Sequence, residues 1–134
     1  MSVKDYRDLI VWQKSMDLAE NVYSVSRLFP KSETYGLVSQ IRRAAISIPS
    51  NIAEGQGRYS DADFARFLSI ANGSIKEVET QLFLAVRLNY IPDTQIHTCM
   101  ILCDETARLI AGLRNKLLDN SNCKRNVSGR EGRG

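Results

Sequence analysis

Cysteine and histidine are the residue types of this 134-residue sequence best suited to bind a metal or attack a substrate. Cys99 and Cys103 lie one helical turn apart, and His97, the single histidine, is close to them in sequence. On a helix, with about 100° per residue, His97 would point about 200° away from Cys99, so the three side chains do not converge. A structural zinc ion also needs four ligands. We therefore predict two small buried cysteines on a core stripe, with no metal and no other cofactor.

Paired catalytic groups are the second kind of chemistry to consider. No serine or cysteine has a general base beside it in the sequence, as an activated nucleophile would need. A carboxylate-bridged two-metal bundle requires Glu-x-x-His motifs on two helices, and the sequence contains none. Glu54, Glu77 and Glu79 are most simply interpreted as solvated or ion-paired side chains. We predict that the protein has no catalytic residues and is not an enzyme.

Arginine side chains offer a third kind of chemistry, the binding of phosphate. Arg42 and Arg43 are adjacent, and Arg58 follows near the end of the same expected helix. The forked donors of arginine suit phosphate oxygens, but they suit carboxylates of a neighbouring helix or subunit equally well, and both interpretations stay open. Together with Lys124 and Arg125 these arginines are our candidate nucleic-acid-binding residues. No aromatic residue is interleaved with the arginines, so a base-stacking platform is not predicted.

The charge distribution separates the body of the chain from its C-terminal end. Residues 120–134 hold four of the 18 basic residues and one of the 15 acidic residues, which leaves 14 of each in residues 1–119. The net charge of +3 therefore lies entirely in the tail. No apolar run is long enough for a membrane span, and the first residues have no apolar signal core, so we expect a cytoplasmic protein that does not enter a membrane.

Helical periodicity accounts for most of residues 1–119 and predicts an all-α fold. Helices are expected at about 6–28, from the turn after Pro30 to about 54, from the Ser60 cap to about 89, and at 93–118. The third has the clearest seam, with apolar residues stepping by four and three at Phe64, Leu68, Ala71, Ile75, Val78, Leu82 and Ala85. We predict one domain, an antiparallel up-and-down four-helix bundle over 1–119, and a disordered basic tail over 120–134.

The second expected helix contains a proline. The apolar 3-4 spacing continues through Pro49, from Val38 and Ile41 to Ile48 and Ile52. Because proline removes a backbone donor and its ring presses on the preceding turn, we predict one helix that is kinked at this residue.

The first expected helix has two apolar stripes, although a bundle core needs only one. One stripe contains Trp12 and Met16, and the other lies about 125° further round the helix. A deeply buried helix in a monomer would explain both stripes, but we favour a homo-oligomer. The candidate interface combines the second stripe with two leucines of the third helix: Val11, Leu18, Val22, Val25, Leu84 and Leu88.

Four sequence blocks resemble one protein family. In order they read LIVWQKSMDLA, FPKSETYGL, YGLVSQIRRAA with IPSNIAEG, and FLSIANGSIKEVETQL, over roughly residues 9–118. These blocks are similar to the bacterial proteins encoded in intervening sequences of 23S ribosomal RNA genes, also labelled S23 ribosomal protein. The resemblance implies a four-helix bundle, commonly a ring-shaped homopentamer, without known catalytic activity. A more distant relative is the basic, pentameric accessory protein of diversity-generating retroelements, which works with a reverse transcriptase and nucleic acid.

Two functions follow as expectations. The first is a non-catalytic cytoplasmic oligomer that binds RNA through basic patches and tails. The second is a protein-interaction module, a ring that holds a partner such as a nucleic-acid enzyme. The neutral body favours the second function, whereas the family context and the basic tail favour the first.

Overall fold

A computed structural model describes residues 5–131 of the chain and the side chains of residues 5–123. Its four α-helices are α1 (Ile10–Ser26), α2 (Leu37–Gln56), α3 (Asp61–Arg87) and α4 (His97–Glu131). Short 3₁₀ helices precede α1, α2 and α4 at Tyr6–Asp8, Lys31–Glu33 and Asp93–Ile96. The described residues contain no strand, so the predicted all-α fold is confirmed.

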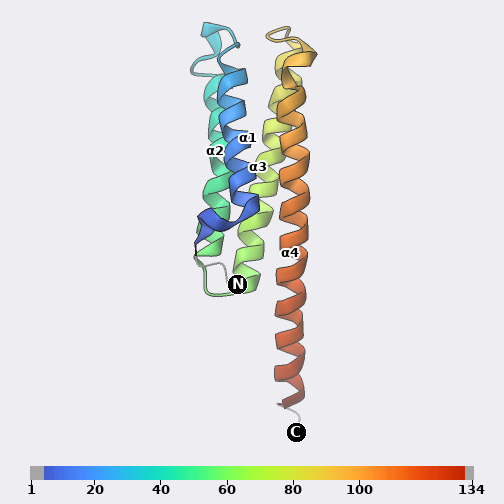
Figure 1. Ribbon diagram of the computed structural model, residues 1–134. Helices are drawn as coiled ribbons and strands as arrows, with labels where there is room; N and C mark the ends of the chain where they lie inside the picture. The colour runs from blue at the N-terminus through green and yellow to red at the C-terminus, as the bar shows by residue number, and fades with distance from the viewer. Residues whose placement is uncertain (1–4, 132–134) are drawn as a thin grey trace.

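The helices form an up-and-down four-helix bundle (Figure 1). Each helix packs along two others, in the cyclic order α1, α2, α3, α4. The α1–α2 and α3–α4 turns lie at one end of the bundle, and the α2–α3 turn lies at the other. At the first end the two turns are joined, because the Tyr90 hydroxyl donates to Glu33 Oε2 at 2.9 Å and the Tyr90 ring packs near Phe29. This hydrogen bond raises the pKa of Tyr90.

The apolar stripes predicted from the sequence meet in a single core. The α3 seam is buried almost completely, with Leu68, Ala71, Ile75, Val78, Leu82 and Ala85 all at 0% exposure. Ile96 of the last 3₁₀ helix and Cys99, Cys103 and Ile110 of α4 add to this core. Burying this much aliphatic surface is the main source of stability in a bundle of this size.

The ends of α3 show how local sequence defines the element. Ser60 Oγ accepts a hydrogen bond from the Asp63 N–H at 3.1 Å, as the predicted helix cap requires. At the other end Asn89 adopts a positive φ of 61°, and the Tyr90 N–H donates to the Ala85 carbonyl at 2.9 Å. This is the left-handed helix stop that asparagine tolerates better than most residues.

Pro49 lies inside α2, which is one continuous helix from Leu37 to Gln56. Polar side chains close to it in sequence are hydrogen-bonded: Asn51 Nδ2 donates to the Ser47 carbonyl at 2.8 Å, and the hydroxyls of Ser47 and Ser74 share a hydrogen bond of 2.6 Å. The continuity of the helix through the proline is therefore as expected, while the kink itself stays a prediction.

The second stripe of α1 requires a correction. Val11, Leu18, Val22 and Val25 are buried in the core of the single chain, with exposures between 0% and 7%. They are therefore unavailable to a second copy while the bundle is folded. Both stripes are apolar. The stripe with Leu18 and Val22 has compact, branched side chains that fit the core, whereas the stripe with Met16 and Tyr23 lies nearer the surface.

The last helix extends past residue 120, where we expected the bundle domain to end, and the disordered tail stays a prediction. The structure continues α4 to Glu131, so that the helix projects beyond the end of the bundle (Figure 1). No proline interrupts residues 120–131, and the helical hydrogen-bond ladder can therefore extend past the last core contact.

Two helix glycines provide a matched test of this packing. A Cβ on Gly55 would lie 2.7 Å from Phe67 Cβ and 2.9 Å from Phe64 Cδ1, whereas a Cβ on Gly73 meets nothing within 4 Å. Gly55→Ala should lower the free energy of unfolding by about 1–3 kcal/mol through overpacking. Gly73→Ala should raise it by up to about 1 kcal/mol through helix propensity. Urea unfolding followed by circular dichroism measures both, and equal effects would refute the close α2–α3 approach.

Candidate interaction surfaces and arginine sites

The cysteines are core residues, as predicted. Cys99 and Cys103 are both at 0% exposure, and desolvation raises the pKa of each thiol to about 12. At neutral pH they are therefore neutral thiols and poor nucleophiles. His97 lies apart from them and faces Asp93, with 3.6 Å between Nε2 and Oδ2. Among the described residues no group of three or more His, Cys, Asp or Glu side chains could hold a metal ion.

Arg42 is bound within its own chain. Its Nε donates to Ser26 Oγ at 2.9 Å, and its Nη2 donates to the Tyr23 carbonyl at 3.4 Å. The guanidinium also lies over the Tyr23 ring, 4.5 Å from its centroid. These contacts engage Nε, Nη2 and one face of the Arg42 guanidinium and join α1 to α2, so this arginine has fewer donors free for a phosphate than an unbound one.

The other sequence candidates differ in how free they are. Arg58 is exposed, pairs with Glu54 four residues earlier at 3.6 Å, and lies over the Phe67 ring. Arg43 is exposed and makes no hydrogen bond or ion pair with any described residue. The side chains of Lys124 and Arg125 lie outside the described residues. The structure therefore separates Arg42 and Arg43, neighbours in sequence, into a bound and a free arginine.

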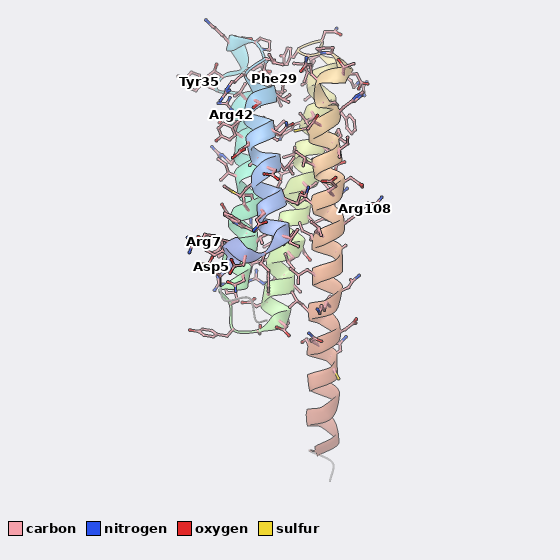
Figure 2. All side chains as sticks on the ribbon, viewed as in Figure 1. Asp5, Arg7, Phe29, Tyr35, Arg42 and Arg108 are labelled. Atoms are coloured by element: carbon pink, nitrogen blue, oxygen red, sulfur yellow. The ribbon has the colours of Figure 1, made fainter. Side chains whose placement is uncertain are left out.

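A groove runs along the outside of the α1–α2 pair. Two adjoining hollows share Tyr23 and Ile46; the first extends toward the α1–α2 turn with Tyr35 and Arg43, and the second extends along α1 to Met16. Ile46 is 47% exposed and Tyr35 is 97% exposed. Tyr35 projects from the bundle near the end where Arg42 lies (Figure 2). We call this surface the α1–α2 groove.

A second apolar surface lies on α3. Phe83, Leu84 and Leu88 are 50%, 44% and 46% exposed, and they line one hollow together with Thr80 and Arg87. We call this surface the α3 patch. It contains the two predicted interface leucines, Leu84 and Leu88, and the structure leaves both accessible. Clustered large apolar side chains of this kind are typical of contact surfaces, whereas single exposed ones are not.

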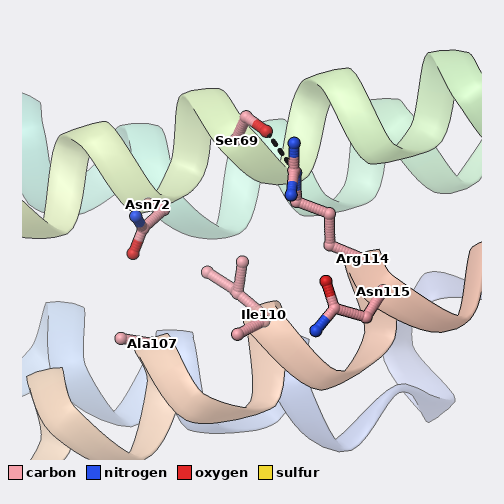
Figure 3. Close-up of a pocket in the computed structure, with 7 residues that line it drawn as sticks. Ser69, Asn72, Ala107, Ile110, Arg114 and Asn115 are labelled. Carbon is pink, nitrogen blue, oxygen red and sulfur yellow. Dashed lines mark hydrogen bonds between the residues drawn. The ribbon is translucent and has the colours of Figure 1, made fainter. Parts of the chain in front are cut away.

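A third hollow lies between α3 and α4 (Figure 3). Its volume is about 200 Å³, and it is lined by Ser69, Asn72, Ala107, Ile110, Ala111, Arg114 and Asn115. Arg114 Nε donates to Ser69 Oγ at 2.7 Å across the two helices. We call this hollow the Arg114 pocket.

Sequence reasoning missed several of these residues. Ile46 lies off the apolar stripe of α2, and an apolar residue on the outer face of an amphipathic helix was the signal that could have marked it. Arg114 gave no local signal, because its partner Ser69 is 45 residues away in sequence.

The fold defines the class of this protein as an all-α four-helix bundle, and comparison with known proteins gives its family. Residues 7–112 match the sequence profile of the 23S rRNA-intervening sequence proteins, and the chain belongs to that family. No curated protein matches the chain. No described helix is long and apolar enough to cross a membrane.

A solved structure is similar to this chain. It is the crystal structure of a protein of unknown function from the S23 ribosomal protein family of Bacteroides thetaiotaomicron, with a TM-score of 0.72 and 27% sequence identity. The similarity covers 78% of this chain and 98% of that protein, so the bundle is the shared unit.

The adjacent arginines of α2 provide a direct test of the bound and free assignments. Arg42→Gln should lower the free energy of unfolding by about 1–2 kcal/mol, because it removes the bond to buried Ser26 and the contact with the Tyr23 ring. Arg43→Gln should change it by less than about 0.5 kcal/mol. Both variants lose the same charge, so chemical unfolding compares them directly. Equal destabilisation would show that Arg42 is not a specific link between α1 and α2.

Proposed function

We propose that this protein is a non-catalytic protein-interaction module that self-associates and offers its outer surfaces to a partner. The observation that carries this proposal is the presence of two exposed apolar surfaces, the α1–α2 groove and the α3 patch, formed by different helices of one chain. Arg58, Arg66 and Arg108, exposed elsewhere on the bundle, are paired with carboxylates of the same chain, which reduces the basic surface open to phosphate. Because its three cysteines are free, the protein suits a reducing compartment such as the cytoplasm.

Two different apolar surfaces suit a head-to-tail assembly. When the groove of one copy receives the patch of the next, the same contact repeats around an axis and closes into a ring if the rotation permits. Five subunits is the number implied by the sequence resemblance. A ring repeats every remaining surface several times, so a partner that binds weakly to one subunit is held by several contacts at once.

RNA binding is a second candidate function, supported by Arg43. This guanidinium is exposed, makes no pair with described residues, and lies beside the protruding Tyr35. The net charge of residues 120–134 adds to the attraction of a polyanion. Such binding would be held by phosphate contacts and would show little sequence preference.

Charge substitutions test the self-association. Leu84→Glu on the α3 patch and Ile46→Glu in the α1–α2 groove should each convert the oligomer to monomers at micromolar concentration, because a carboxylate would be buried without a partner. Ile101→Glu is the matched control; Ile101 is 58% exposed and lies outside both surfaces, so the oligomer should persist. Sedimentation velocity reports the mass. A monomeric parent protein, or three variants that all keep the oligomer, would refute these contacts.

A salt titration tests RNA binding. If Arg43 contacts a phosphate, Arg43→Gln should reduce the slope of log affinity against log salt by about 0.7–0.9. Removal of residues 120–134 should reduce it further, because four basic residues and one acidic residue are lost. Arg108→Gln is the charge-matched control, since Arg108 is already paired with Asp104 at 2.9 Å and the slope should not change. Fluorescence anisotropy with a structured RNA measures each slope, and identical slopes would exclude Arg43 and the tail as contacts.

A further inference from the structure

The Arg114 pocket combines an apolar floor with a polar rim. Ile110 is 2% exposed and forms the floor, and Ala107 and Ala111 also line the hollow with small side chains. The rim consists of Ser69 and Asn72 from α3 and of Arg114 and Asn115 from α4. Figure 3 shows these polar side chains around the same space between the two helices.

Ser69 orients the arginine without neutralising it. The Ser69 hydroxyl donates its hydrogen to the Ala65 carbonyl at 3.2 Å, so its oxygen is free to accept from Arg114 Nε at 2.7 Å. This uses one edge of the guanidinium. The donors on both terminal nitrogens of Arg114 have no acceptor among the described residues, and arginine stays charged at every physiological pH.

Arg114 is bonded to a serine, whereas two other arginines of α3 and α4 are bonded to acidic side chains. Arg66 pairs with Asp63 at 3.1 Å, and Arg108 pairs with Asp104 at 2.9 Å. The seven residues that line the pocket include no aspartate or glutamate. A half-buried, fixed cation with free forked donors therefore faces a hollow that contains no counter-charge.

From this arrangement we propose that the Arg114 pocket binds a small organic anion through its carboxylate or phosphate group. The terminal nitrogens of Arg114 provide a bidentate contact to two of its oxygens. The amides of Asn72 and Asn115, which have no other partner among the described residues, add donors from the two walls. A volume of about 200 Å³ accommodates the charged group and a short apolar stem above Ile110. The inference is independent of self-association and of RNA binding.

The test follows the arginine side-chain Nε–H signals of the isotope-labelled full-length protein by NMR. Inorganic phosphate and succinate are titrated separately at constant ionic strength and pH. We expect the Arg114 signal to move and reach a plateau with at least one probe, while the signals of Arg66 and Arg108 stay in place. Comparison of the two dissociation constants shows whether phosphate or carboxylate is preferred. Linear movement without a plateau, or equal movement at all three arginines, overturns the proposal.

Three variants make the assignment specific. Arg114→Gln should abolish saturable binding, read from the backbone amides of residues 72 and 115. Ser69→Ala should weaken binding by about three- to tenfold, because the guanidinium loses one oriented hydrogen bond. Arg108→Gln should bind like the parent protein. Circular dichroism confirms that each variant keeps its helical fold. Saturable binding that survives Arg114→Gln, or that is lost in Arg108→Gln, would place the anion elsewhere.

Discussion

The close approach of α2 and α3 is the constraint on which the rest of the bundle depends. Gly55 leaves no room for a side chain against Phe67, and the hydroxyls of Ser47 and Ser74 meet at 2.6 Å. Both contacts require small residues on the facing surfaces, since a larger side chain would separate the helix axes. The helices α1 and α4 pack against this α2–α3 pair. Their apolar stripes determine how much apolar surface stays exposed to solvent.

The packing of α1 determines which of its apolar side chains remain available. The stripe with Leu18 and Val22 fills the core, and this turns the stripe with Met16 and Tyr23 outward beside Ile46 of α2. The α1–α2 groove is therefore a consequence of core packing, because one helix cannot bury two stripes in one bundle core. Of the predicted interface side chains, Leu84 and Leu88 of α3 are accessible, whereas the four of α1 are buried and the other stripe of α1 lies nearer the surface.

The sequence predicted the features that depend on periodicity and local capping. The α3 seam from Leu68 to Ala85 and the Ser60 cap were both correct, because burial and helix geometry act on neighbouring residues. It did not predict which arginines are engaged. Arg42 is held by Ser26 and Arg114 by Ser69, and these pairs are 16 and 45 residues apart. Such contacts depend on the register between helices, which the spacing within one helix does not determine.

Arg42 and Arg114 are each bound by a serine of the preceding helix, but the surroundings of the two guanidinium groups differ. In both cases a helix serine donates its hydrogen to a carbonyl of its own helix and accepts from an arginine Nε of the next helix. In the α1–α2 pair the Tyr23 carbonyl accepts from Nη2 and the Tyr23 ring lies against the guanidinium, which makes Arg42 a structural link. In the α3–α4 pair no aromatic side chain lines the hollow, so the same anchoring leaves the terminal nitrogens of Arg114 facing it. The groups around the anchored guanidinium therefore decide whether it joins two helices more tightly or leaves its terminal nitrogens facing a hollow.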